Sequence, residues 1–362
     1  MKYFIIGIGM PSWHTTRSRW LPFAAAGGVT VVCFLVLEVG VRFAGLAPPL
    51  NAAAQAYVAD PDLPFKPAPG SRLTGRSPTD EFDFDYAHNS LGFRDTEHAL
   101  AKPAGWFRIA AVGDSFTYGA AVPFAQTYLV QLETMLNARG SSHPSVEILK
   151  LGIVRYFPEP ERLVLEHYAL QYSPDLILVG FVPNDVIDTA LGIDAIQTDA
   201  EGLLRTRESK ELGPLGIFLF EHSHLFRIVL SRYVASRVQR RTPIHLEEIY
   251  RADGFHEKDW RRVEDEFGRM RDAANRAGAK LAIIYIPMLE AWAPQHAYPS
   301  ERLATWSARN GVSFIDTLPP LRAASLAGVS VYYVRDGHCT PQGYAIIAQT
   351  IAAELSRLRL VP

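Results

Sequence analysis

The sequence is poor in cysteine and carries no excess charge of one sign. Its 362 residues include two cysteines, and 36 Lys and Arg stand against 38 Asp and Glu, giving a formal net charge of −2. Because Cys33 lies in an apolar run, we expect no disulfide between it and Cys339. Without a basic excess, sequence-independent binding to DNA or RNA would lack its main source of affinity, so we expect no nucleic-acid partner.

Several signatures of bound ligands are also missing. The chain contains no CxxC pair, no HExxH and no EF-hand loop, and it shows no internal repeat. The usual zinc and calcium motifs are therefore absent. We accordingly predict no metal site and no cofactor.

A long apolar run near the N-terminus predicts a membrane helix over residues 21–45. Residues 21–37 carry no charge, and the run approaches the ~20 residues that span a bilayer. Glu38 and Arg42 are four residues apart and are expected to pair on one helix face. The run is preceded by basic residues only: Lys2, Arg17 and Arg19. The positive-inside rule then predicts a cytoplasmic segment 1–20 and a chain that is otherwise periplasmic or extracellular.

A cleaved signal peptide is the alternative interpretation, because it shares the basic start and the apolar core. The core is long for a signal peptide, and no clean Ala-x-Ala pattern follows it. The pattern therefore favours an uncleaved, single-pass anchor in the inner (cytoplasmic) membrane. The apolar residues 1–10 are too few to span a bilayer.

After the anchor, the composition changes twice. Residues 46–100 begin rich in proline and are interpreted as a linker and wrapped arm, in which residues 81–86 alternate as an edge strand. Residues 101–362 are interpreted as one domain with an insertion at about 190–255. We expect a helix over 223–240 in that insertion. Its arginines either contact anionic lipid or an acidic polymer or, as we favour, form a solvated face: Arg227, Arg232, Arg237, Arg240 and Arg241.

Apolar runs alternate with helix-period segments throughout the domain. The runs predict strands buried on both faces, at 106–113, 146–153, 175–182, 280–287 and 312–316. The helices are expected at 127–138, 159–171, 260–277, 299–309 and 341–358. Five such units predict an open α/β fold, with a central parallel sheet and helices on both faces. Its functional site is expected beyond the carboxyl ends of the strands.

Four short motifs fall at that edge. Ser115 follows the first strand within Gly-Asp-Ser and is placed as a nucleophile whose own N–H can face an oxyanion. Gly152 lies at the end of the second strand and Asn184 follows the third, and they offer a backbone N–H and a side-chain amide. Asp336 and His338 precede the last helix, as a carboxylate and the general base that it orients. Each motif alone also fits an ordinary turn, but their joint occurrence at one edge favours catalysis.

Gly113-Asp114-Ser115, Gly152, Asn184 and Asp336-x-His338 resemble the blocks of the SGNH (GDSL-type) hydrolases, over roughly residues 105–360. The resemblance implies a flavodoxin-like α/β/α sandwich. It implies that Ser115 is the nucleophile, that Asp336 and His338 complete a triad, and that the donors of Ser115, Gly152 and Asn184 form the oxyanion hole.

Two features depart from the family pattern. The usual spacing is Asp-x-x-His, whereas here one residue separates Asp336 from His338, as in SGNH-like proteins that acetylate alginate. Asp316, at the end of the fifth strand, is the alternative partner of His338. Lys150 and Arg155 flank Gly152, where the family often has Asn and Gly. Arg155 either binds an anionic substrate or, as we favour, is solvated.

These observations predict a membrane-anchored serine esterase that acts on acyl esters. Small acyl groups such as O-acetyl, on cell-envelope polysaccharide, are the expected substrate. An acyltransferase would use the same residues, and sequence alone does not separate the two. A non-catalytic glycan-binding protein is a further alternative, which the intact set of five residues disfavours.

Overall fold

The structure is a computed structural model, and it describes ten stretches of the chain: 21–46, 57–77, 79–140, 143–193, 197–198, 204–205, 213–230, 232–233, 247–293 and 296–362. The chain divides into two compact units. The first comprises Met1–Pro49 and Pro214–Ala235, and the second comprises Leu50–Gly213 and Ser236–Pro362. The expectation for residues 1–20 falls outside the described residues.

A five-stranded parallel sheet forms the centre of the second unit. Its strands are β5 (Phe107–Gly113), β6 (Val146–Lys150), β7 (Leu176–Phe181), β10 (Lys280–Tyr285) and β11 (Ser313–Asp316). They are arranged in the order β11-β10-β7-β5-β6, and every neighbouring pair is parallel. This is the flavodoxin-like order, with β5 as the first strand. All five predicted strands are confirmed, and so is the predicted fold class.

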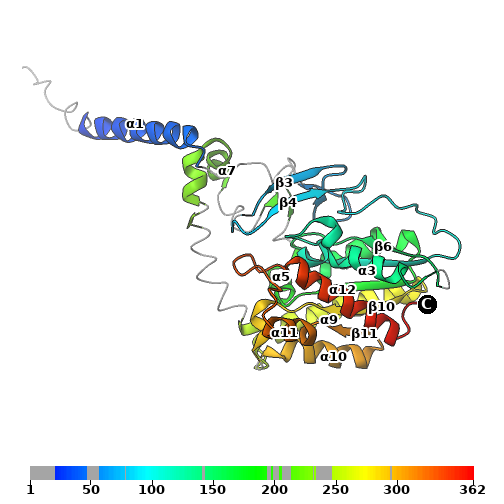
Figure 1. Cartoon of the computed structure of the whole chain (residues 1–362). Helices are drawn as coiled ribbons and strands as arrows, with labels where there is room; N and C mark the ends of the chain where they lie inside the picture. The colour runs from blue at the N-terminus through cyan, green and yellow to red at the C-terminus, as the bar shows by residue number, and fades with distance from the viewer. Residues whose placement is uncertain are drawn as a thin grey trace, which may run out of the picture. The chain divides into compact units, whose positions relative to one another are not determined.

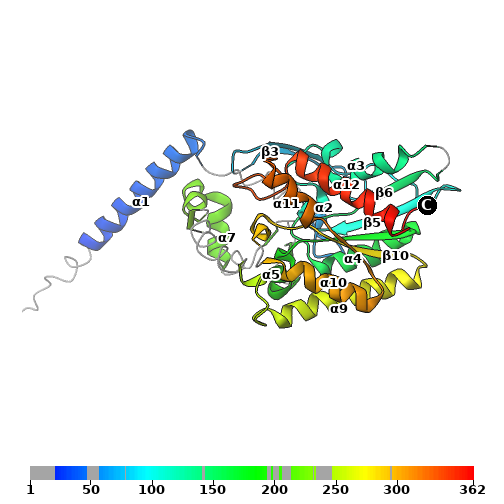
Figure 2. The ribbon, with the colours of Figure 1, turned by 60° about the horizontal axis from the view of Figure 1, so that its bottom comes forward.

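Helices cover both faces of the sheet, as Figure 2 shows. On one face lie α4 (Pro158–His167), α9 (Glu257–Arg276) and α10 (Tyr298–Asn310), whose apolar residues pack with Ala110 and Val112. On the other face lie α3 (Tyr128–Asn137) and α12 (Pro341–Arg357), which pack with Ile109 and Ala111. Alternate residues of β5 thus enter opposite cores, which explains the continuous apolar run in its sequence. These helices match the five predicted ones to within a few residues, although α4 is followed by a separate short helix at Ala169–Tyr172.

Within the part of the chain that the structure describes, four helices were not predicted. They are α2 (Ser115–Tyr118), α5 (Asn184–Leu191), α7 (Gly213–His222) and α11 (Leu318–Leu326). Helices α2, α5 and α11 each begin within three residues of the end of a strand. Short 3-10 helices also occur at Phe124–Gln126 and Leu289–Trp292.

The segment before the sheet forms two small antiparallel pairs. Strand β1 (Tyr57–Val58) pairs with β2 (Lys66–Pro67), and β3 (Arg72–Arg76) pairs with β4 (Asp83–Ala87). The strand expected at 81–86 therefore exists as β4, in a two-stranded sheet that is separate from the main one. It pairs with β3 alone, because the chain returns on itself after β3. Leu63, Phe65 and Phe93 of this segment are buried in the same core as α4 and α9.

The first unit contains the long apolar helix α1 (Leu21–Phe43). Pro22–Phe43 has a mean hydropathy of 2.1, is long enough to cross a membrane, and has no residue of its apolar window buried within the protein. Helix α7 (Gly213–His222) lies beside its end, as Figure 1 shows. A second helical stretch follows at 224–230. A strand pair in the second unit, β8 (Gln197–Thr198) with β9 (Leu204–Arg205), precedes α7.

The insertion differs from expectation in one respect. The helix predicted over 223–240 is present at 224–230, and Arg237, Arg240 and Arg241 lie outside the described residues. Arg227 is only 4% exposed, so the favoured interpretation of a solvated face is wrong for this residue. Both cysteines are free: Cys33 is exposed on α1 and Cys339 is buried.

Two helical glycines predict opposite effects of the same substitution. A Cβ at Gly343 in α12 would lie 2.2 Å from the backbone oxygen of Val331, whereas a Cβ at Gly268 in α9 meets nothing within 4 Å. We expect Gly343→Ala to lower the free energy of unfolding by about 1–3 kcal/mol. Gly268→Ala is expected to raise it by about 0.5–1 kcal/mol through helix propensity. Denaturant unfolding of both variants checks this, and equal effects would contradict the packing of α12.

Candidate active site

Three of the predicted site residues form a continuous chain of hydrogen bonds. The Ser115 Oγ lies 2.8 Å from His338 Nε2, and His338 Nδ1 lies 2.6 Å from Asp336 Oδ1. All three side chains are partly exposed. The serine hydroxyl is therefore in contact with a base that a carboxylate holds from the far side.

Ser115 is placed by the tight passage from β5 to α2. Asp114 caps α2, and its Oδ1 accepts a hydrogen bond from the N–H of Phe116 at 2.9 Å. A Cβ at Gly113 would lie 2.1 Å from Thr117 Oγ1, so only glycine fits there. Gly119 ends the helix at φ 81°, in the left-handed region. The sequence around the serine thus forces a short, fixed turn.

The loop that carries Asp336 and His338 is closed on itself. The N–H of Tyr333 donates to the carbonyl of His338, and the N–H of Gly337 donates to the carbonyl of Tyr333, both at 2.9 Å. Gly337 has φ 89°, a conformation that glycine adopts readily. This turn lets the two side chains on either side of Gly337 meet although only one residue separates them. The short spacing is therefore compatible with an aspartate–histidine pair.

The structure places Asp336, and not Asp316, against His338. Asp316 instead accepts hydrogen bonds from Ser300 Oγ at 2.5 Å and from the N–H of Leu318 at 2.8 Å. Burial raises the pKa of the Asp336 carboxyl, but hydrogen bonds from His338 and Ser77 outweigh it and hold the pKa below its ordinary value. Asp336 is thus ionised at neutral pH.

Gly152 packs directly on α2. A Cβ at this position would lie 2.4 Å from the backbone nitrogen of Tyr118 and 2.6 Å from the carbonyl carbon of Thr117. The N–H groups of Leu151 and Ile153 donate to carbonyls of β5. Within the described part of the chain, the Gly152 N–H between them has no hydrogen-bond partner. It is therefore available as a donor next to the turn of Ser115.

Asn184 begins α5 at the end of β7. Its Nδ2 donates to Asp188 Oδ2 at 3.1 Å, one helical turn further on. An amide nitrogen has two hydrogens, so this bond fixes one and leaves the other for a second acceptor. Burial raises the pKa of Asp188, while the bond from Asn184 and the charge of Arg155 oppose that rise. Sequence reasoning missed Asp188, because the spacing of four residues brings it to Asn184 only on a helix, and α5 was not predicted.

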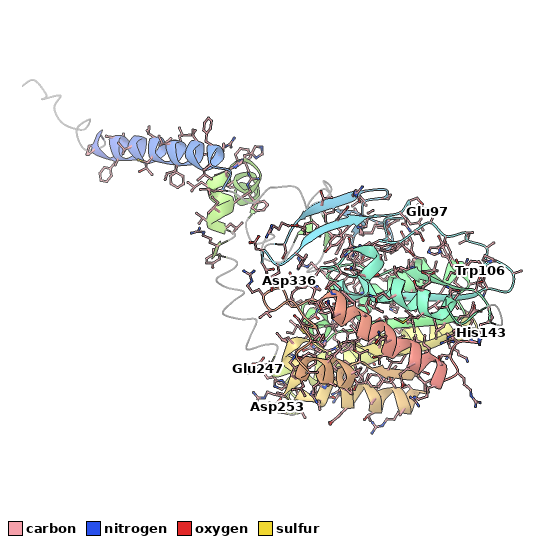
Figure 3. The ribbon with its side chains drawn as sticks, viewed as in Figure 1. Glu97, Trp106, His143, Glu247, Asp253 and Asp336 are labelled. Atoms are coloured by element: carbon pink, nitrogen blue, oxygen red, sulfur yellow. The ribbon has the colours of Figure 1, made fainter. Side chains whose placement is uncertain are left out.

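The turn between β3 and β4 supports the Asp336 loop. The Glu81 carboxylate accepts hydrogen bonds from the N–H of Arg335 at 3.1 Å and of Asp336 at 2.8 Å. The ring of Phe82 lies 5.0 Å from that of Tyr333. Figure 3 shows the labelled Asp336 below this hairpin. Glu81 gave no signal in the sequence, because it is 255 residues from its partner.

The two cations beside Gly152 have different environments. The Lys150 ammonium is buried and pairs with Glu133 at 2.8 Å and with Asp95 at 3.3 Å. It is thereby a structural residue. Arg155 is exposed and has φ 71°.

Three buried carboxyl groups lie behind the site: Asp114, Glu161 and Asp185. Each is at most 1% exposed, and each has at least one oxygen without a hydrogen-bond partner among the described residues. Burial raises the pKa of Asp114 to about 6, and burial with mutual repulsion raises the pKa values of Glu161 and Asp185 well above the ordinary range. Burial thus favours the protonated forms of Glu161 and Asp185.

Among the described residues, no group of three or more His, Cys, Asp or Glu side chains is arranged to hold a metal ion. The donors around Ser115 are N–H groups and a side-chain amide, which suit an anionic oxygen. Chemically, the arrangement can deprotonate a serine and stabilise negative charge beside it.

Neither a protein-family model nor a curated protein sequence matches the chain. Solved structures similar to it include TesA, at 12% identity and a TM-score of 0.42, covering 69% of this chain and 99% of that one. A mutant of Axe2, an acetylxylan esterase from Geobacillus stearothermophilus, is 13% identical over 70% of this chain and 96% of its own, with a TM-score of 0.42. The lipase/acylhydrolase from Enterococcus faecalis is 13% identical over 70% of this chain and 96% of its own, with a TM-score of 0.41. At this level, similarity assigns neither an activity nor a substrate to the chain.

The buried carboxyl groups predict a stability that falls as pH rises. The raised pKa of Glu161 means that the folded state holds this proton to a higher pH than the unfolded chain, which releases it above a pKa of about 4.3, so rising pH favours unfolding. Glu161→Gln removes this contribution. We expect the unfolding free energy of the variant, relative to the parent, to increase between pH 5 and pH 8 by up to about 1.4 kcal/mol per pH unit.

Denaturant unfolding at several pH values measures this difference. Glu159→Gln, at a partly exposed position of the same helix, serves as the control. A difference between Glu161→Gln and the parent that stays constant with pH would show that Glu161 ionises in the folded protein.

Proposed function

We propose that the protein is a serine esterase that hydrolyses acyl esters. The observation that carries this proposal is the hydrogen-bonded chain from Ser115 through His338 to Asp336. A binding protein has no need for a base in contact with a serine hydroxyl. The donors of Gly152 and Asn184, which follow neighbouring strands of the same sheet, further support acyl chemistry.

In the proposed reaction, Ser115 Oγ attacks the ester carbonyl carbon while its proton passes to His338 Nε2. Asp336 accepts a hydrogen bond from the Nδ1–H of His338. This bond fixes the tautomer of the imidazole and stabilises the imidazolium that forms. The N–H groups of Ser115 and Gly152 and the amide of Asn184 bind the oxyanion. His338 then returns the proton to the departing alcohol, and an acyl group remains on Ser115.

Water completes the cycle by the same steps. His338 takes a proton from the water as it attacks the acyl carbon, and the carboxylic acid leaves when the proton returns to Ser115 Oγ. A sugar hydroxyl in place of that water would give acyl transfer. The site contains the groups for either acceptor, and hydrolysis is the simpler reaction to test.

We further infer that α1 is an uncleaved anchor in the inner membrane and that the second unit lies outside that membrane. The proposed substrate is an O-acyl polysaccharide of the cell envelope. The apolar surface of α1 supports membrane anchoring. Hydrogen bonds between α1 and residues 222–225 support retention of the helix in the mature protein. A helix with a folded partner has a role beyond targeting.

The direct test is hydrolysis of p-nitrophenyl acetate and butyrate by the full chain in detergent. We expect turnover by the parent and a loss of several orders of magnitude in Ser115→Ala and in His338→Ala. Release of acetate from an acetylated polysaccharide then tests the proposed substrate class. A folded parent without turnover, or an active Ser115→Ala, would exclude the proposed hydrolysis.

The two candidate aspartates provide a matched comparison. Asp336→Asn leaves the shape of the side chain but removes the charge beside His338, so we expect kcat to fall by up to about 10⁴-fold. Asp316→Asn alters a side chain that contacts Ser300 and Leu318, and we expect kcat to change little. Similar losses in both variants would reject Asp336 as the specific partner of His338.

Asp188 is expected to act through Asn184. Asn184→Ala should lower kcat by about 10²–10³-fold, as expected for the loss of an oxyanion donor. Asp188→Ala frees the Asn184 amide to rotate, and we expect a loss of kcat smaller than that of Asn184→Ala. Asp188→Asn keeps an acceptor for the amide and should retain much of the parent kcat. The double variant should be no slower than Asn184→Ala alone. Fully additive losses would show that Asp188 acts independently of Asn184.

A further inference from the structure

The end of α1 is joined to the insertion by a carboxylate that lies within an apolar helix. Glu38 accepts hydrogen bonds from the Ser223 hydroxyl and from the backbone N–H of His224, both at 2.8 Å, and from the N–H of Leu225 at 2.9 Å. It also pairs with Arg42 at 2.7 Å. The predicted pairing on α1 is thus present, but its larger role is to bind another segment.

Glu38 serves as a cap for the second helical stretch, residues 224–230. The first N–H groups of a helix have no partner within it, and they favour negative charge. The Ser223 Oγ accepts from the N–H of Phe226, and Glu38 satisfies the two N–H groups before it. Arg42 in turn donates to the carbonyl of His222, the last residue of α7. We call α7 and residues 224–230 together the docked helix pair.

The docked helix pair exposes large apolar side chains. Leu215 is 70% exposed, Phe218 is 55% exposed and Val229 is 58% exposed. Leu215 and Phe218 are three residues apart and therefore share one face of α7. Their exposure to water is unfavourable by roughly 25 cal/mol for each Å² of apolar surface.

The depth of Glu38 along α1 places this pair at the membrane boundary. The uncharged stretch 21–37 is about 25 Å long at 1.5 Å per residue, close to the ~30 Å of a hydrocarbon core. Glu38 and Arg42 follow it, and the Arg42 side chain is 51% exposed. Arg227 of the docked helix pair interacts electrostatically with both. The exposed guanidinium of Arg42 beside exposed apolar residues suits the headgroup layer of a bilayer.

We propose that the docked helix pair is a second membrane-contacting element, which lies in the interfacial layer of the lipid bilayer beside the anchor. This inference rests on the proposed retention of α1 in the membrane. Leu215, Phe218 and Val229 enter the boundary between headgroups and acyl chains. Glu38 holds the pair at that depth, and Arg42 faces the lipid phosphates.

The test measures the surroundings of residue 218 in the full chain. Phe218→Cys is combined with Cys33→Ser and carries a nitroxide label, while Cys339 is buried and does not react. The protein is reconstituted in vesicles of phosphatidylcholine and phosphatidylglycerol. Collision rates are then measured with oxygen, which concentrates in lipid, and with a water-soluble nickel chelate. The control is Leu326→Cys on α11, where the native side chain is 84% exposed.

We expect the label at 218 to collide mainly with oxygen, with a ratio of oxygen to nickel collisions several-fold above that of the label at 326. Nickel collisions as frequent as at 326 would overturn the proposal. Weak collisions with both reagents would overturn it as well, because they would mean that a second copy or another protein covers Phe218.

Glu38→Ala provides the second measurement. Without the carboxylate, the docked helix pair loses its cap, and the label at 218 should become several-fold more accessible to nickel. Glu38→Gln keeps one acceptor, so the accessibility of its label to nickel should lie between those of the parent and of Glu38→Ala. An unchanged label in Glu38→Ala would exclude Glu38 as the residue that holds the pair. Carbonate extraction of the same vesicles reports separately on α1: release of the parent chain would refute the proposed anchoring, whatever the esterase activity.

Discussion

The parallel direction of the five strands is the constraint on which the site depends. Because every strand of the sheet runs the same way, all carboxyl ends lie at one edge. Ser115 follows β5, Gly152 follows β6 and Asn184 follows β7, and these three strands are neighbours in the sheet. Residues that are far apart in sequence thus converge through backbone topology alone. The buried, apolar strands supply the rigidity that a fixed arrangement of donors requires.

Close approach of backbone segments then sets the fine geometry. At Gly113 and Gly152, the space of a Cβ is occupied by α2, so the turn that carries Ser115 rests on the ends of two strands. Gly337 contributes differently, since its positive φ bends the chain between Asp336 and His338. Polar groups outside the sheet complete the arrangement: Glu81 holds the loop and Asp188 holds Asn184. The site is therefore a product of packing as much as of its own side chains.

The sheet was predictable because its strands are buried on both faces and read as continuous apolar runs. Because parallel strands end at one edge, the sequence also predicted that Ser115, Gly152 and Asn184 lie at that edge, together with His338 in the loop before α12. The spacing left Asp336 and Asp316 as rivals, because the left-handed turn at Gly337 is a three-dimensional property. Glu81 and the cap at Glu38 depend on contacts across long separations, for which a single sequence contains no signal. Arg227 was interpreted as solvated because the sequence does not show that it interacts with Glu38 and Arg42 of α1, a distant segment.

The hydrogen bonds that the Glu81 carboxylate accepts also show that the functional unit begins before the main sheet. Leu63, Phe65 and Phe93 belong to the core shared by α4 and α9, and Glu81 binds the backbone of Asp336. A shorter chain that starts at residue 101 would retain all five sheet strands and every residue of the hydrogen-bonded chain. It would nevertheless expose part of its core and leave the Asp336 loop without support. Truncation at the apparent start of the sheet would therefore produce an inactive fragment whose failure says nothing about the chemistry of Ser115.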